Sequence, residues 1–249
     1  MNLYIKYLFI LFVFRTINVS GQASELKLVF AGDIMGHDTQ IESAREGNAY
    51  NYDTCFSLIR PILENADIAI ANLEVTLAGE PFKGYPQFSS PDELAISARN
   101  AGFDLFITAN NHSLDRRKQG LERTNEILEK ENIIHTGTFN DETTRASNFP
   151  LIIEKNGIRL AILNYTYGTN GLKVQSPNIV NYIDREIIKN DLVKAKLAQP
   201  DYTIVTIHWG SEYQRNQNEE QENLAKYILE NGANAIIGSH PHVIQKINS

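Results

Sequence analysis

Cysteine is almost absent from the chain, and its scarcity excludes several kinds of site. The 249 residues include a single cysteine, so the chain can form neither an internal disulfide nor a cluster of thiolate ligands. Cys55 stands among Tyr52, Phe56, Leu58 and Ile59, without a cationic neighbour that would activate a thiolate nucleophile. We therefore expect Cys55 to be a small buried apolar residue.

Concentrated positive charge is also missing. The chain has 23 Lys and Arg against 30 Asp and Glu, a formal net charge of −7, and no extended basic run. A protein that holds a polyanion by ion pairing alone carries a basic patch or stripe. Nucleic acid is therefore not expected as a partner.

No apolar run reaches the roughly 20 residues that a spanning helix needs. The longest is YLFILFVF at residues 7–14, which follows Lys6 and precedes small residues, as in a signal peptide. Residues 3–19 are interrupted by only a few polar residues, so an uncleaved anchor stays open as the alternative. We expect residues 1–23 to be a signal peptide or an N-terminal anchor, and the protein to be exported, with membrane association through the N-terminus in the second case.

The chain contains no repeat, low-complexity segment or linker that would divide it. Hydrophobic residues make up 42% and charged residues 21%, which is typical of a globular domain with a sizeable core. We expect one domain over residues 24–249.

Short apolar runs rich in β-branched residues alternate with amphipathic stretches of helical length, which indicates an α/β fold. The expected strands are 26–31, 67–71, 103–109, 203–207 and 234–238. The expected helices are 53–65, 91–101, 120–132, 184–197 and 219–231. Ser90 should cap the second helix and Gly102 should end it. Asn156-Gly157 predicts a hairpin between 151–155 and 158–164, and hence a mixed sheet.

Five expected strands run directly into polar residues that can bind a metal. These residues are Asp33, Glu74, Asn111 with His112, His208, and His240 with His242. Because the carboxyl ends of neighbouring parallel strands share one edge of a sheet, these side chains should converge there. Core packing does not explain them, since carboxylates and imidazoles are poor core residues unless paired. The pattern predicts a metal site.

Taken singly, each of these residues has a structural alternative. Asp33 could cap a helix, Asn111 could form an Asx-turn, and His208 could be a satisfied histidine at a strand end. His240-Pro241-His242 is the stronger signal, because two imidazoles flanking a proline project from a rigid extended dipeptide.

The remaining candidates stay open. His135 has no second ligand beside it and is expected to be structural. His37 follows Asp33 closely and could either reach the site or begin the next helix. Trp209 could line the pocket near His208 or pack beneath it, and Glu212 and Tyr213 follow as further candidates for the pocket lining.

The order of these motifs resembles the five-block signature of the calcineurin-like metallophosphoesterases, in the variant carried by CapA-type poly-gamma-glutamate capsule biosynthesis proteins. The blocks are Gly32-Asp33, Asn72-Leu73-Glu74, Asn110-Asn111-His112, His208 and Gly238 to His242. The wider superfamily has Asp-x-His as its first block and a bridging Asp where this chain has Glu74. TANNHSLD, HWGSEY and NGANAIIGSHPHVIQ are similar to the capsule subgroup, and the resemblance covers residues 26–247.

The resemblance implies a calcineurin-like metallophosphatase sandwich with α/β/β/α layers, mixed sheets and two divalent transition metal ions. By position, one ion would be held by Asp33 and His242 and the other by Asn111, His208 and His240, with Glu74 as the bridge. This donor set, with nitrogen and oxygen but no thiolate, suits Mn, Zn or Fe. Members of the family usually continue past the HPH block, so the resemblance also predicts a fold that is incomplete at its C-terminus.

Two such ions, about 3.5 to 4 Å apart, lower the pKa of a bridging water, so that metal-activated hydroxide attacks without a protein nucleophile. His112 resembles the superfamily histidine that protonates the leaving group, and Asp115 would orient its ring. The structural alternative is that His112 only supports the ligands.

Two functions follow from the resemblance. The first is a capsule biosynthesis hydrolase that acts on a phosphoester, or on an amide bond such as those of poly-gamma-glutamate. The second is a non-enzymatic accessory protein for polymer assembly or export, whose metal site holds an anionic polymer or a capsule-synthesis partner. A proton donor at His112 favours the hydrolase, because an accessory protein that only binds a polymer or a partner does not need one.

Overall fold

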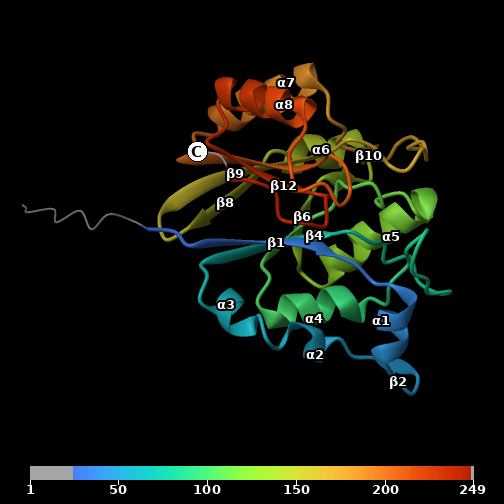
Figure 1. Ribbon diagram of the computed structural model, residues 1–249. Coiled ribbons are helices and arrows are strands. Elements are labelled where there is room, and N and C mark those ends of the chain that lie inside the picture. Colours follow the sequence, from blue (N-terminus) through green and yellow to red (C-terminus); the bar gives the residue numbers. More distant parts are fainter. Residues whose placement is uncertain (1–24, 248–249) are drawn as a thin grey trace, which may run out of the picture.

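The computed structural model describes residues 25–247, which form four layers of helix, sheet, sheet and helix (Figure 1). The predicted α/β/β/α sandwich is confirmed. Within the described residues, no helix combines the length and the apolar character that crossing a membrane requires. The signal peptide or anchor predicted for residues 1–23 lies outside this range.

The first sheet is entirely parallel, in the order β1-β4-β5-β6. Its strands are β1 (Leu28–Ile34), β4 (Ile68–Leu73), β5 (Leu105–Ile107) and β6 (Ile134–Thr136). Every residue of β4 is buried, as expected for a central strand covered on both faces. The register between β1 and β4 shifts between Phe30 and Asp33, and such an irregularity re-aims the side chains that follow it.

The second sheet, in the order β12-β11-β9-β8, contains the predicted antiparallel pair. Its strands are β12 (Ala235–Ser239), β11 (Tyr202–His208), β9 (Ile158–Thr166) and β8 (Leu151–Lys155). The first three are parallel, and β8 runs antiparallel to β9. Asn156 and Gly157 join them with φ of 54° and 76°, as in the predicted tight turn. This sheet is therefore the mixed one.

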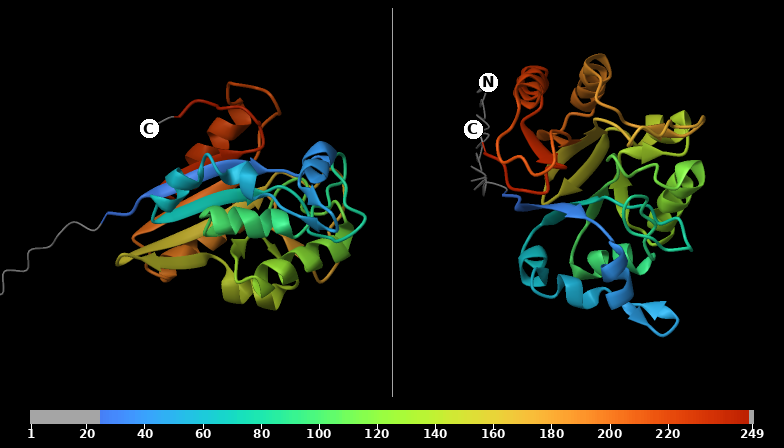
Figure 2. Two further views of the ribbon diagram at one scale, coloured as in Figure 1. Left: turned by 90° about the horizontal axis from the view of Figure 1, so that it is seen from below. Right: turned by 45° about the vertical axis from the view of Figure 1, so that its right-hand side comes forward.

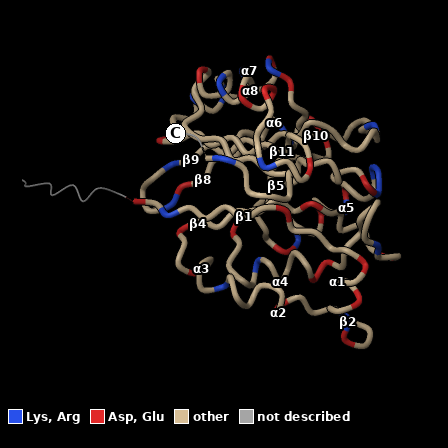
Figure 3. The backbone as a smooth tube through the Cα atoms, in the orientation of Figure 1, with Lys and Arg blue, Asp and Glu red and all other residues tan. Residues whose placement is uncertain are grey.

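Helices cover the outer face of each sheet (Figure 2), and acidic and basic residues are spread along the backbone of both halves (Figure 3). Those of the first half are α1 (Asp38–Ser43), α2 (Asp53–Phe56), α3 (Arg60–Glu64), α4 (Glu93–Ala101) and α5 (Arg117–Lys130). Those of the second half are α6 (Glu142–Asn148), α7 (Arg185–Leu197) and α8 (Glu219–Glu230). Two short antiparallel pairs complete the fold, β2 (Arg45–Glu46) with β3 (Ala49–Tyr50) and β7 (Thr138–Phe139) with β10 (Ile179–Val180).

An apolar cluster joins the inner faces of the two sheets. The first sheet contributes Ile68, Ile70, Leu105 and Ile107, and the second contributes Ile158, Leu160, Ile162 and Ile204. Burying one such side chain stabilises the fold by about 1.5–3 kcal/mol. The cluster holds the sheets face to face, so the carboxyl ends of β1, β4 and β5 are fixed beside those of β9, β11 and β12 (Figure 2).

The helix expected over residues 53–65 is interrupted, and this expectation is wrong. Residues 57–59 separate α2 from α3, because Pro61 has no N–H to donate and its ring would clash with the carbonyl of Ser57 in a continuous helix. The expectation for Cys55 is also wrong, since its side chain is exposed on the single turn of α2. Phe56 is the residue of that turn that enters the core.

The helix expected over residues 91–101 begins two residues later, at Glu93. Ser90 does not cap it, since the Ser90 hydroxyl is buried without a hydrogen-bond partner. Gly102 ends the helix with φ of 118°, as predicted, in the left-handed region that glycine adopts at least cost. The helices expected over 184–197 and 219–231 are α7 and α8.

Candidate metal centre

The structure brings the six predicted ligands and the two predicted catalytic residues to one edge of the sandwich. Asp33 lies near the end of β1, Glu74 follows β4, and Asn111 and His112 follow β5. His208 ends β11, and His240 and His242 follow β12. The edge is therefore built by the carboxyl ends of strands from both sheets, where sequence reasoning placed it.

Glu74 lies at the centre of this cluster and is completely buried. Its Oε2 accepts a hydrogen bond of 3.3 Å from Asn72 Nδ2. Its Oε1 has no hydrogen-bond partner and lies 3.6 Å from His208 Nε2 and 4.0 Å from His112 Nε2. Burial, and then the negative charge of Asp33, raise the pKa of Glu74 to about 10. An unpartnered carboxyl oxygen among buried imidazoles is a site that a cation would complete.

Asp33 has the opposite electrostatic environment. Its Oδ1 accepts from Asn72 Nδ2 at 2.8 Å, and its Oδ2 lies 3.0 Å from His242 Nδ1. Burial opposes ionisation of Asp33, but the hydrogen bond from His242 and the other polar contacts outweigh it and hold the pKa below its usual range. The same contact raises the pKa of His242. Asp33 is thus the ionised carboxylate of the site and Glu74 the neutral one.

His208 is completely buried, and burial lowers its pKa to about 3, so the ring is neutral. Its Nδ1 faces Asn72 Nδ2 at 3.2 Å and Ser239 Oγ at 3.0 Å. Its Nε2 lies 2.7 Å from Asn111 Oδ1. Since the Asn111 Oδ1 amide oxygen can only accept, the network assigns the proton of His208 to Nε2.

His240 and His242 occupy strained backbone positions. Their φ angles are 96° and 53°, in the left-handed region that L-residues rarely adopt. Tyr213, with φ of 62°, donates its backbone N–H to the Pro241 carbonyl at 2.8 Å and so ties the preceding loop to the HPH segment. The His240 ring lies 4.7 Å from that of His208, and its Nδ1 is buried without a partner. Such strain persists where the surroundings fix it, typically at functional sites.

His112 is held in a fixed orientation beside the ligands. Its Nδ1 lies 2.7 Å from Asp115 Oδ2, and Asp115 also accepts the backbone N–H of Phe88 at 2.7 Å. The Phe88 ring packs edge-on against the imidazole, with 4.7 Å between ring centroids. These contacts leave His112 Nε2 facing the centre of the site, 4.0 Å from Glu74 Oε1.

Two groups of three side chains have ligand atoms within 4.8 Å of one another. They are Glu74 with His240 and His242, and Asp33 with Glu74 and His208. Glu74 belongs to both groups, which is the position that the resemblance implies for a bridge. The resemblance assigns Asp33 and His242 to one ion, whereas these groups place Asp33 with His208, and His242 with His240. The assignment of the histidines to the two ions stays a prediction.

Sequence reasoning missed the amides that organise the ligands. Asn72 is completely buried, and its Oδ1 accepts from Asn110 Nδ2 at 3.1 Å while its Nδ2 faces Asp33, Glu74 and His208. The available signal was an Asn inside the otherwise apolar strand β4, which is tolerated only when its amide is fully hydrogen-bonded.

The open candidates fall outside the ligand cluster. His37 forms the N-cap of α1, and its ring packs edge-on against Phe88 at 5.1 Å. His135 lies on β6 with its Nδ1 3.1 Å from the Ile133 carbonyl, which fits the expected structural role. Trp209 packs in the core beside the second sheet, while Tyr213 stays exposed near His242.

A four-layer sandwich with strand-end residues gathered at one edge defines a metallophosphoesterase-like fold. The chain belongs to the bacterial capsule synthesis protein family PGA_cap, whose model matches residues 27–249. The resemblance to CapA-type capsule biosynthesis proteins is thereby confirmed.

Two curated relatives cover most of the chain. The chain is 28% identical over 239 residues to the capsule biosynthesis protein CapA of Bacillus anthracis. The aligned region covers 90% of this chain and 56% of the relative. The chain is also 27% identical over 234 residues to the PGA biosynthesis protein CapA of Bacillus subtilis. That aligned region covers 89% of this chain and 59% of the relative. The chain therefore spans a little over half the length of these relatives.

Proposed function

We propose that this chain is a dinuclear-metal hydrolase of capsule biosynthesis that cleaves a phosphoester or an amide bond. The observation that carries the proposal is the setting of Glu74, a buried carboxyl whose Oε1 has no partner and which belongs to both groups of potential ligands. A cation there would satisfy Glu74 Oε1, and His240 and His242 offer ring nitrogens in the same group of potential ligands.

The donor set fits two divalent ions of Mn, Zn or Fe. The residues that would hold them are Asp33, Glu74, Asn111, His208, His240 and His242. When bound, such a pair lowers the pKa of water and stabilises charge on the attacked group. The rings of His208 and His240 are neutral, because burial lowers the pKa of each. For Nε2 of His208 to bind an ion, its proton would have to move to Nδ1, where Ser239 Oγ can accept it.

The chain itself supplies the proton for the leaving group. Asp115 accepts the Nδ1 proton of His112, so Nε2 faces the site, and the ring with a proton on both nitrogens would donate the one on Nε2 to the leaving group. Phe88 fixes the plane of the ring from one side. The half-exposed Tyr167 ring lies 4.8 Å from that of His240.

The substrate class that we propose is an anionic capsule polymer or its precursor, and the setting is extracytoplasmic. The family name and the PGA biosynthesis role in the name of the Bacillus subtilis relative support the polymer. The signal-like pattern of residues 1–23 supports export.

The test is turnover by the full chain loaded separately with Mn, Zn or Fe, using a generic phosphodiester and poly-gamma-glutamate. We expect His112→Ala to lower turnover by about 100-fold or more while metal content stays unchanged. His135→Ala is the matched control, because it removes an imidazole that lies outside the ligand cluster. A metal-loaded chain that turns over neither substrate would favour the accessory role, and full activity in the His112 variant would refute the assignment of the acid.

A further inference from the structure

Two buried side-chain amides connect the carboxyl groups of the candidate metal centre with the segment that carries His112. Asn72 lies on β4 shortly before Glu74, and Asn110 follows β5 shortly before His112. Both asparagines are completely buried, and Asn110 Nδ2 lies 3.1 Å from Asn72 Oδ1. Because buried amides satisfy their hydrogen bonds, the partners of each amide decide which way its oxygen and its nitrogen point.

Backbone groups fix the orientation of the Asn110 amide. Its Oδ1 accepts the backbone N–H of His112 at 3.0 Å, and its Nδ2 donates to the Leu73 carbonyl at 2.8 Å. A backbone N–H can only donate and a carbonyl can only accept, so the flipped amide would lose both hydrogen bonds. The second proton on Asn110 Nδ2 is therefore the one that Asn72 Oδ1 accepts.

The orientation of Asn110 in turn fixes that of Asn72. Because Asn72 Oδ1 accepts from Asn110, the two protons on Asn72 Nδ2 must face the proposed ligands. This nitrogen lies 2.8 Å from Asp33 Oδ1 and 3.3 Å from Glu74 Oε2. Its third neighbour, His208 Nδ1 at 3.2 Å, is no acceptor in the tautomer that would bind an ion through Nε2. In that tautomer one proton is left for each carboxyl group.

The hydrogen bonds from Asn72 leave the second oxygen of each carboxyl group facing the histidines. The second oxygen of Asp33, Oδ2, lies 3.0 Å from His242 Nδ1. That of Glu74, Oε1, has no hydrogen-bond partner and lies 3.6 Å from His208 Nε2. A group that orients a metal ligand from behind typically contributes about 10- to 100-fold to the affinity for the metal.

We propose that Asn72 and Asn110 act as a pair of positioning residues, which decide the oxygens that Asp33 and Glu74 present to a metal. This inference rests on the proposed function. Asn72 contacts both carboxyl groups, and Asn110 acts through Asn72 by fixing the orientation of its amide. The hydrogen bond from the His112 N–H makes the same pair a link between the ligands and the proposed proton donor.

The test measures the affinity of the full chain for Zn²⁺ by competition with a chromophoric chelator, so it does not depend on turnover. Asn72→Ala and Asn110→Ala should each raise the Kd about 10- to 100-fold. The double variant should lose less than the product of the two single losses, because the two residues act as one unit. The visible spectrum of the Co²⁺-loaded chain should change in both single variants, since it reports the coordination geometry.

Asn110→Asp is a second variant, for the case that the cavity in an alanine variant prevents folding. It keeps the shape of the side chain and the acceptor for the His112 N–H, but it removes the donors to Leu73 and Asn72. The Asn72 amide should then turn its nitrogen toward the new carboxylate and its oxygen toward the ligand carboxyl groups. Added negative charge alone would strengthen cation binding, so a raised Kd identifies the lost orientation as the cause.

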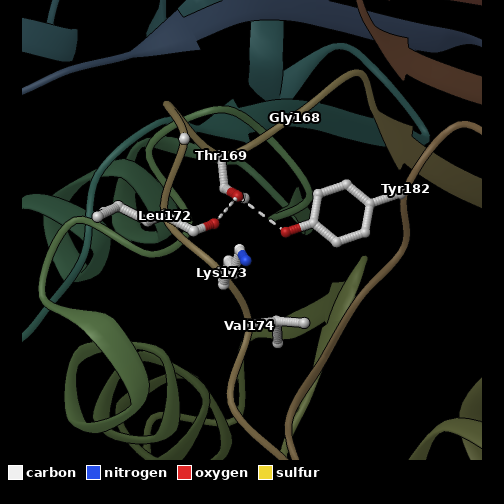
Figure 4. Close-up of a pocket in the computed structure, with 7 residues that line it drawn as sticks. Gly168, Thr169, Leu172, Lys173, Val174 and Tyr182 are labelled. Carbon is white, nitrogen blue, oxygen red and sulfur yellow. Dashed lines mark hydrogen bonds between the residues drawn. The ribbon is translucent and has the colours of Figure 1, made fainter.

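Two control variants disturb buried hydrogen bonds elsewhere. Asn125→Ala is the matched control, because Asn125 is a buried asparagine on α5 whose amide donates to Asn140 Oδ1 at 2.9 Å. Thr169→Val removes a hydroxyl that bonds to the Leu172 carbonyl at 2.6 Å and to the Tyr182 hydroxyl at 2.8 Å (Figure 4). The pocket that these three residues line includes none of the proposed metal ligands. Both controls should keep the wild-type Kd and spectrum.

The outcomes separate this inference from the proposed function. A wild-type Kd in Asn72→Ala or Asn110→Asp, or an equal loss in Asn125→Ala, would overturn the positioning role even if the chain binds metal and is active. Weaker binding confined to the Asn72 and Asn110 variants, in a chain that hydrolyses no substrate, would support the positioning role and refute the hydrolase. A wild-type chain that binds neither Zn²⁺ nor Co²⁺ would overturn both.

Discussion

Replacing Glu74 with Gln in the metal-free protein removes a buried carboxyl, one oxygen of which has no hydrogen-bond partner, with almost no change of shape. Burial and the charge of Asp33 raise the pKa of Glu74 from 4.5 to about 10. Between about pH 4.5 and about pH 10, Glu74 keeps its proton in the folded state and releases it in the unfolded state. The free energy of unfolding must therefore fall as the pH rises through this window.

The slope of this effect is about 1.4 kcal/mol per pH unit for a single proton. From about pH 7 to about pH 9, the wild type should lose up to about 2.7 kcal/mol through Glu74. The Glu74→Gln variant cannot titrate at this position and should keep that stability. The difference between the two proteins cancels contributions from groups that titrate in both.

The assay is urea unfolding in the presence of a chelator at both pH values, followed by circular dichroism. Glu154→Gln, an exposed carboxylate on β8, is the matched control and should follow the wild type. Parallel pH dependence in the wild type and the Glu74 variant would show that Glu74 is ionised in the folded protein, and would refute the reasoning.

Two further predictions concern the fold. Arg145→Met should lower the free energy of unfolding by about 2–3 kcal/mol, because it removes the buried cation 2.6 Å from Asp191 and leaves that carboxylate only the half-exposed Lys194 and the Tyr165 hydroxyl as partners. Urea unfolding measures this change, and the Arg145→Met/Asp191→Leu double variant should recover part of the lost stability. An unchanged midpoint in the single variant would contradict the prediction. Gly137→Ala should lower the free energy of unfolding by about 2 kcal/mol or more. The reason is that φ at this position is 123°, and the added Cβ would lie 2.5 Å from Ala109 N and overlap Asn164 Oδ1. A thermal midpoint equal to that of the wild type would contradict the second prediction.

The layers could be predicted because parallel strands buried on both faces read as short apolar runs, as Ile68–Leu73 does. The hairpin could be predicted because Asn156-Gly157 has a specific turn chemistry. The break at Pro61 was also readable from the sequence, since proline disrupts a helix interior. The helices α1 and α6 are too short to show a period, and the outward position of Cys55 depends on how a single turn packs.

The positions of the site residues could be predicted because the topology of parallel strands brings strand ends together. The connecting amides could not, since Asn72 meets partners 38 residues away in Asn110 and 136 residues away in His208. The neutral state of Glu74 likewise depends on burial that only the folded chain creates.

The measurement that tests the central claim most directly is the metal content of the purified full chain by elemental analysis. The wild type is compared with the His240→Ala/His242→Ala double variant, and with His135→Ala as the matched control. The account predicts about two equivalents of Mn, Zn or Fe in the wild type and the control, and their loss in the double variant. A folded wild-type chain that binds no metal under any loading condition would contradict it.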